Sequence, residues 1–143
     1  MGVKSYYLDS SIVLSFLLQE QGYLFKGGTL EGLFTSKLTE VETCRVFDRL
    51  KLTGKTDNAL HANRMQEAGW LFSAITFVSP NDRILNVAKS PWTLPVKALD
   101  AIHIATALEI RERGLDTVFC TLDRQQGLAA QAVGFDVESE FKP

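Results

Sequence analysis

Short runs of β-prone residues alternate with helical segments along the whole sequence, and this alternation restricts the fold more than any other feature. The β-prone runs lie at residues 3–8, 33–36, 74–79, 117–122 and 135–137. Apolar residues recur at helical spacing in residues 10–19, 38–52, 57–72, 81–88, 96–113 and 124–133. Strands joined by helices pair in parallel and are covered on both faces. We therefore expect an α/β protein, a three-layer sandwich around a mostly parallel sheet of about four or five strands.

Size and composition fit a single domain spanning residues 1–143. With 143 residues, 45% of them hydrophobic, the chain can bury a core and is too apolar to be disordered. No apolar stretch approaches the ~18–20 residues of a membrane span, so no membrane contact is expected. Cys44 and Cys120 stand far apart in apolar surroundings, which predicts two reduced, buried thiols and a cytoplasmic location. Residues 21–32 hold four of the ten glycines and are expected to form a loop or a short frayed helix.

The charge balance excludes one way of binding nucleic acid. Lys and Arg together number 15 against 17 Asp and Glu, which gives a formal net charge of -2. A polycation that holds nucleic acid by bulk charge alone is therefore excluded.

Two aspartates directly follow predicted strands. Asp9 comes after the first strand and Asp123 after the fourth. Each could simply cap the next helix, and Asp123 with Gln126 has the spacing of a capping box. In open parallel sheets, however, ligands bind at the carboxyl ends of the strands. Both aspartates therefore also qualify as site residues.

Glu42 lies in the helix predicted over residues 38–52, at the edge of its apolar face. We expect Val46, Phe47 and Leu50 to define the buried face of that helix. The structural alternative for Glu42 is an ion pair with Arg45, one turn further along. The functional alternative is a carboxylate that projects toward the carboxyl end of the sheet.

Asp100 lies in the first turn of the helix over residues 96–113. Its neighbours one turn on, Ile104 and Ala107, are apolar, and a buried carboxylate is costly unless it is paired or binds a metal. A purely structural Asp100 would gain from the helix dipole. His103 follows three residues later, where it could share a metal face with Asp100 or serve the structure alone.

Taken together, these four carboxylates predict one metal site. In a doubly wound sheet their positions converge on one edge, where like charges repel unless a divalent cation neutralises them. Oxygen ligands select Mg²⁺ or Mn²⁺ over zinc. Such a site suits phosphodiester cleavage, since the metal activates water and stabilises charge on the phosphate.

Four segments, read in order, resemble motifs of the PIN domain family and of its VapC-type toxin branch. They are YLDSS at 7–11, TSKLTEVE at 35–42 followed by Arg45, LDAIHIATA at 99–107 and CTLDR at 120–124. The resemblance implies a PIN-like fold and a metal-dependent endoribonuclease. Its acidic quartet corresponds to Asp9, Glu42, Asp100 and Asp123, as catalytic and metal-binding residues. Ser11 and Thr121 match supporting hydroxyl residues.

The resemblance also implies partners. VapC-like proteins are typically homodimers held inactive by a VapB-type antitoxin, and they cut structured RNAs such as tRNA or rRNA. Arg45, Arg49 and Arg124 stand near the acidic positions, where they could contact RNA phosphates or pair with those carboxylates. Apolar residues of the second long helix and Trp92 could meet a partner or merely cover the core.

Three other readings remain open from the sequence. One is a PIN nuclease that acts in RNA processing, which would differ only in having no antitoxin gene beside its own gene. A catalytically inactive PIN-like binding module would usually lack one of the four carboxylates, and this chain retains all four. A phospho-acceptor receiver domain normally has paired acidic residues after the first strand, where only Asp9 stands here.

Overall fold

The computed structural model describes residues 4–18 and 32–138, so most of the predicted loop at 21–32 lies outside it. Five strands alternate with six helices over this part of the chain. The strands are β1 (Lys4–Leu8), β2 (Leu33–Ser36), β3 (Thr76–Val78), β4 (Asp116–Cys120) and β5 (Asp136–Glu138). The helices are α1 (Ser10–Leu17), α2 (Leu38–Leu52), α3 (Asn58–Ala74), α4 (Asp82–Ala88), α5 (Ala98–Glu112) and α6 (Arg124–Ala132).

All five strands form one sheet in the order β3-β2-β1-β4-β5, and every neighbouring pair is parallel. The chain runs outward from β1 to β3, then crosses back to place β4 on the other side of β1. This reversal puts the topological switch point between β1 and β4, where Leu8 pairs with Cys120. The predicted parallel α/β sandwich is confirmed.

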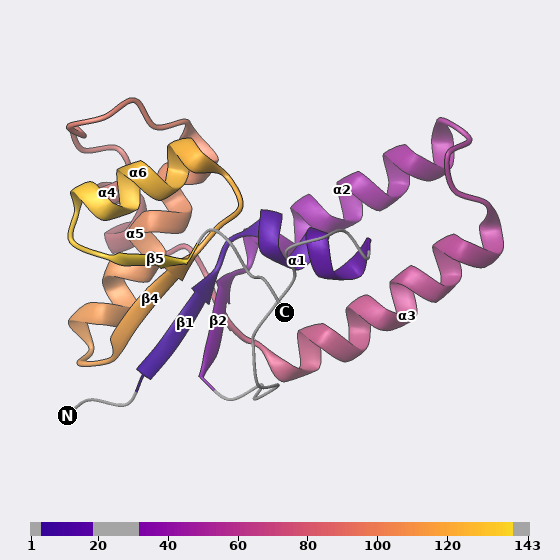
Figure 1. The fold of residues 1–143 in the computed structure, drawn as a ribbon, viewed down its shortest axis with the longest axis horizontal. Coiled ribbons are helices and arrows are strands. Elements are labelled where there is room, and N and C mark those ends of the chain that lie inside the picture. The colour runs from indigo at the N-terminus through magenta and orange to yellow at the C-terminus, as the bar shows by residue number, and fades with distance from the viewer. Residues whose placement is uncertain (1–3, 19–31, 139–143) are drawn as a thin grey trace.

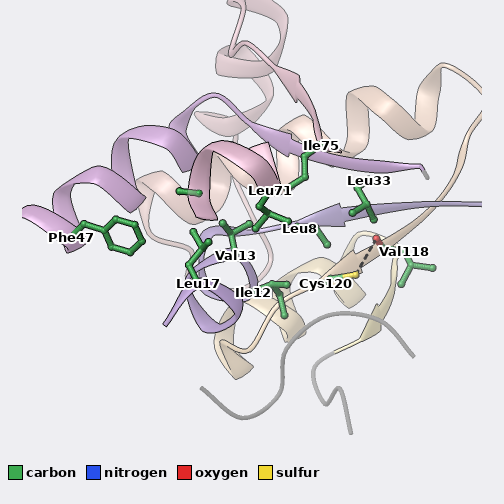
Figure 2. Packing of buried hydrophobic residues seen from close by; sticks show 11 residues of the cluster. Leu8, Ile12, Val13, Leu17, Leu33, Phe47, Leu71, Ile75, Val118 and Cys120 are labelled. Atoms are coloured by element: carbon green, nitrogen blue, oxygen red, sulfur yellow. Dashed lines mark hydrogen bonds between the residues drawn. The ribbon is translucent and has the colours of Figure 1, made fainter. Parts of the chain in front are cut away.

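Alternation along the central strands builds a separate core on each face of the sheet. Leu8 and Cys120 point into a cluster covered by α1, α2 and α3, which includes Ile12 and Leu71 (Figure 2). Their strand neighbours, among them Phe119, point into the other cluster, which α5 and α6 cover. Figure 1 shows α4, α5 and α6 gathered on one side of the strands and α1, α2 and α3 on the other.

The buried face of α2 differs from the predicted one. Phe47 is buried as expected, but the other buried residues of this helix are Thr39 and Thr43, while Val46 and Leu50 are only half-buried. The Thr39 hydroxyl lies 2.7 Å from that of Thr35 in β2, so hydroxyl pairing sets the rotation of the helix. The same rotation turns Cys44 outward, and its predicted burial was wrong, whereas Cys120 is buried.

Helices α2 and α3 form a long hairpin that extends away from the sheet (Figure 1). Gly54 in the connection has a φ of 75°, which favours glycine. On α3, Leu71 is buried, but Leu60, Met65 and Trp70 are exposed, Trp70 by 57%. Leu71 therefore covers the core, whereas Leu60, Met65 and Trp70 lie at the surface.

Helix α5 matches the predicted buried helix, although it begins at Ala98 rather than at residue 96. More than half of its 15 residues are buried, including His103. Within the described part of the chain, no helix has the length and hydropathy needed to cross a membrane.

Candidate active site

The ends of β1 and β4 bring the predicted acidic residues to the switch point of the sheet. Asp9 follows β1 directly, and its N–H donates to the carbonyl of Cys120 at the end of β4, at 3.1 Å. Asp123 lies three residues beyond the end of β4 and caps α6. Helix α2 brings Glu42 from one face and α5 brings Asp100 from the other. This is the edge where doubly wound sheets bind ligands.

Asp9 is almost fully buried, with 2% of its surface exposed. As predicted for a helix cap, it accepts the N–H of Ile12 at 3.2 Å. Ser11 also donates its hydroxyl to Oδ1 of Asp9 at 2.6 Å, and Thr121 donates to Oδ2. Burial raises the pKa of the Asp9 carboxyl, and the hydrogen bonds from Ser11 and Thr121 offset that effect only in part. Asp9 therefore caps α1 and is also a buried carboxyl whose ionisation is disfavoured by burial.

The two hydroxyls that hold Asp9 also join the strand ends to one another. Ser11 Oγ accepts the N–H of Leu122 at 3.0 Å, and Thr121 Oγ1 accepts the N–H of Asp123 at 3.0 Å. The sequence positions that the family resemblance marked as supporting therefore contact the first aspartate directly.

Glu42 is engaged by two side chains from other elements. Ser10 donates to Oε2 at 2.8 Å, and Nε2 of His103 lies 2.8 Å from Oε1. Partial burial acts to raise the pKa of Glu42, but the interactions with His103 and Ser10 outweigh it, so the pKa is lowered. The predicted alternative of an ion pair with Arg45 was wrong, because Arg45 pairs with Asp48 at 3.3 Å.

His103 is the site residue whose role sequence reasoning missed. It is 1% exposed, and its Nδ1 lies 2.6 Å from the hydroxyl of Tyr7 in β1. Burial, and next the charge of Asp9, raise the pKa of Tyr7 well above its usual range. The spacing of Asp100 and His103 suggested that the two could bind one metal ion. In the structure the His103 ring contacts Glu42 instead. Only the folded sheet, which brings Glu42 of α2 and His103 of α5 together at its edge, could reveal this partner.

The pKa of Asp100 reflects the negative charges around it. Its pKa is raised by burial first, then by the negative charge of Asp123, with a smaller contribution from Glu42. The charges of Asp123, at the β4–α6 junction, and of Glu42, on α2, therefore both act on Asp100. The predicted four-carboxylate metal site stays a prediction.

Gln126 links the elements that carry Asp100 and Asp123. Its backbone N–H donates to Oδ1 of Asp123 at 3.1 Å, as predicted for a cap. Its side chain does not complete the capping box; the amide donates to the carbonyl of Asp100 at 3.3 Å instead. Gln126 is 2% exposed, so this bridge fixes α6 against the start of α5.

The donor set fits a hard divalent cation in chemistry and in charge. The candidates are carboxylate oxygens, which Mg²⁺ and Mn²⁺ prefer, and a cation would relieve the repulsion that raises the pKa of Asp100. Among residues 4–18 and 32–138, no three or more His, Cys, Asp or Glu side chains are grouped closely enough to hold a metal. Asp100 and Asp123 are both reached by solvent.

The three arginines near the acidic positions are not neutralised by them. Arg45, Arg49 and Arg124 are exposed. In the described part of the chain, no ion pair joins any of them to the four carboxyls, so that predicted alternative was wrong.

Known proteins resemble this chain in sequence and in fold. Residues 6–131 match the PIN domain family. The chain is 27% identical over 136 residues to Ribonuclease VapC47 of Mycobacterium tuberculosis, covering 90% of this chain and 92% of that protein. The crystal structure of PAE2754 from Pyrobaculum aerophilum superposes with a TM-score of 0.64 at 18% identity, over 97% of this chain and 88% of that one. FitAcB from Neisseria gonorrhoeae gives a TM-score of 0.65 at 22% identity, over 92% and 95%.

Proposed function

Because the chain belongs to the PIN domain family, we propose that it is a VapC-like endoribonuclease that uses Mg²⁺ or Mn²⁺ to cleave structured RNA such as tRNA or rRNA. The observation that carries the proposal is the position of Asp9 and Asp123 just beyond the paired strands β1 and β4, where the hydroxyls of Ser11 and Thr121 hold Asp9. The charges of Asp123 and Glu42 act on Asp100 at the same edge. Side chains that repel one another at the switch point of a parallel sheet are typical of a site that awaits a cation and an anionic substrate.

The four carboxyls would hold the metal. Asp9, Glu42, Asp100 and Asp123 supply its oxygen ligands, and a bound divalent ion would activate water and stabilise charge on the attacked phosphate. Two of these carboxyls are already oriented by hydrogen bonds, Asp9 by the hydroxyls of Ser11 and Thr121 and Glu42 by Ser10 and His103. Preorganised ligands of this kind lower the cost of binding the ion.

The exposed arginines would bind the RNA backbone. Arg45 and Arg49 lie on α2, the helix of Glu42, and Arg124 directly follows Asp123. Guanidinium groups that are not committed to the carboxyls can pair with phosphate oxygens on either side of the cleaved bond. This placement also accounts for RNA binding by a chain of slightly negative net charge.

A VapB-type antitoxin and a second copy of the chain are the proposed protein partners, and the cytoplasm is the proposed location. Support comes from α3, which exposes Leu60, Met65 and Trp70. A hollow of about 200 Å³ lies between α1 and α3, lined by Leu17, Leu18, Leu60, Asn63, Arg64 and Glu67. An apolar helix or strand of a partner would find both hydrophobic cover and charged rim residues there.

The proposal is tested by cleavage of purified transfer RNA with Mg²⁺, with Mn²⁺ and with EDTA. Asp9→Asn and Asp100→Asn should each lower the rate at least about 100-fold, because several kcal/mol of transition-state stabilisation depend on the ion. Asp116→Asn is the matched control, since this exposed aspartate lies at the opposite end of β4. Cleavage that persists in EDTA, or that both site variants retain, would contradict the proposal.

A further inference from the structure

A line of hydrogen-bonded side chains connects the interior of the sheet with Glu42. Tyr7 of β1 places its hydroxyl 2.6 Å from Nδ1 of His103, and Nε2 of the same ring lies 2.8 Å from Oε1 of Glu42. Ser10 completes the line by donating to Oε2 of Glu42 at 2.8 Å. Both oxygens of this carboxylate are therefore held by other elements of the protein.

The two partners of His103 determine where its ring carries a proton. A carboxylate has no proton to donate, so Glu42 can only accept from the His103 ring, whose Nε2 lies 2.8 Å from Oε1. Nε2 of His103 must then carry a proton and donate it to Glu42. The Tyr7 hydroxyl lies 2.6 Å from Nδ1, where it can donate to the ring in the tautomer that carries its proton on Nε2.

Packing fixes this ring in place. Tyr7 is fully buried and His103 is 1% exposed. The Tyr7 ring stacks on Phe119 of β4 at a centroid distance of 5.3 Å and meets the His103 ring edge-on at 5.8 Å. A ring enclosed in this way is a rigid donor, unlike an exposed lysine or arginine that pairs with a carboxylate.

We propose that His103 is a positioning residue that holds the Glu42 carboxylate in a single orientation, and that Tyr7, by donating to Nδ1, stabilises the tautomer of His103 that this requires. The inference rests on the proposed function, in which Glu42 is a metal ligand. Hydrogen-bond donors behind metal-binding carboxylates typically contribute about 10–100-fold to metal affinity or activity. We expect a loss in that range when the donor to Glu42 is removed.

Two substitutions at His103 separate positioning from mere support of the core. Glutamine places its amide nitrogen where Nε2 stands and can still donate to Glu42. Asparagine is shorter, so its amide coincides with Nδ1 and cannot reach Glu42. Both remove the ring, and therefore both carry a similar loss of packing. His61→Gln on α3 is the matched control for the other histidine of the chain.

The first readout is the affinity for Mn²⁺ alone, measured by the electron paramagnetic resonance of the free ion, with thermal unfolding beside it. We expect His103→Gln and His61→Gln to bind Mn²⁺ like the wild type, and His103→Asn to bind about 10–100-fold more weakly. The inference is overturned if the Gln and Asn variants are equally impaired, or if neither is impaired.

Tyr7→Phe provides a second, milder variant that removes only the hydroxyl. The ¹⁵N spectrum of the His103 ring should then change from one tautomer to a mixture, with a fall in Mn²⁺ affinity smaller than that of His103→Asn. An unchanged tautomer in Tyr7→Phe would overturn the part assigned to Tyr7.

Cleavage of transfer RNA in the same variants separates this inference from the proposed function. A wild type that binds Mn²⁺ but leaves RNA intact would refute the proposed function, and the Mn²⁺ affinities would still decide the role of His103. A wild type that cleaves RNA while His103→Asn retains full affinity and rate would refute the inference alone. A wild type that binds no Mn²⁺ would refute both.

Discussion

Thr121 donates its hydroxyl proton to Oδ2 of Asp9, although the two residues are 112 positions apart in the sequence. The contact joins the end of β4 to the end of β1, and it supplies one of three donors to a carboxylate that is 2% exposed. Without such donors, a buried carboxylate would lose its charge. The stability of this fold and the chemistry of its site therefore depend on the same hydrogen bonds.

Thr121→Val should destabilise the protein by about 1–3 kcal/mol, because it leaves a buried carboxylate oxygen and the N–H of Asp123 without their partner. Thr121→Ser retains the hydroxyl and should cost clearly less. Urea unfolding of the two variants measures the difference. Equal losses in the two variants would contradict a dominant contribution of the hydroxyl.

Asp9→Asn should make the metal-free protein more stable near neutral pH, by about 1 kcal/mol, or ~3 °C in Tm. The pKa of Asp9 is raised in the folded state. The folded protein therefore binds more protons than the unfolded chain between the ordinary aspartate pKa and that raised value, and its stability falls as the pH rises through this window. Asparagine does not ionise, so the stability of the variant does not fall in this pH window.

The pH dependence of that difference is the control. Thermal unfolding in EDTA should show the advantage of Asp9→Asn shrinking as the pH is lowered, until below about 3 Asp9 is protonated in both states. An advantage of the same size at every pH would point to the hydrogen bonds of Asp9 instead of its charge.

Mn²⁺ should raise the Tm of the wild type, by the equivalent of about 2.7 kcal/mol when the free ion exceeds its Kd about 100-fold. Ligand carboxyls must lose their protons to bind the ion, and the pKa values of Asp9 and Asp100 are both raised. The increase should therefore be larger near neutral pH than near pH 5. No response of the wild type at neutral pH would favour a PIN-like binding module without catalysis.

Asp123→Asn should lower the pKa of Asp100, because the negative charge of Asp123 is one cause of its elevation. Asparagine also accepts hydrogen bonds as a helix cap, so α6 should keep its stability. Asp123→Ala removes the charge and the acceptor for Gln126, at a further cost of about 1 kcal/mol. Carboxyl ¹³C titration and urea unfolding separate the two roles, and an unchanged pKa in both variants would contradict the repulsion.

Gly54→Ala and Gly69→Ala should have opposite effects on stability. Neither glycine has another atom within 4 Å of an added Cβ. Gly54 has a φ of 75°, where alanine is strained by about 1 kcal/mol. Gly69 lies inside α3, where alanine should stabilise by about 0.5–1 kcal/mol. Thermal unfolding measures both, and effects of the same sign would contradict this account of the hairpin.

Most elements of the fold could be predicted from sequence because their signals are local. Strands of β-branched and aromatic residues, and helices with caps such as Asp9 and Asp123, carry their patterns within a few residues. The rotation of α2 was predicted less well. Counting apolar side chains favoured Val46 and Leu50, whereas the buried face holds Thr39, whose hydroxyl pairs with that of Thr35.

The candidate site, too, could be predicted from sequence only in part. The convergence of carboxyls followed from strand order, since the carboxyl ends of parallel strands share one edge. The partner of Glu42 did not follow, because His103 lies 61 positions away and only packing brings the two together. Arg45 was the natural local candidate for an ion pair, and tertiary contacts replaced it. The metal-binding roles of the four carboxyls remain predictions.

The pairing of β1 with β4 has a consequence for the synthesis of this protein on the ribosome. Asp9 leaves the ribosome early, but its partner Thr121 is added 112 residues later. At ~5–20 residues per second, a nascent chain spends roughly 6–22 s with half a site. The proposed metal site can therefore be complete only after Thr121 and Asp123 have been synthesised and β4 has paired with β1.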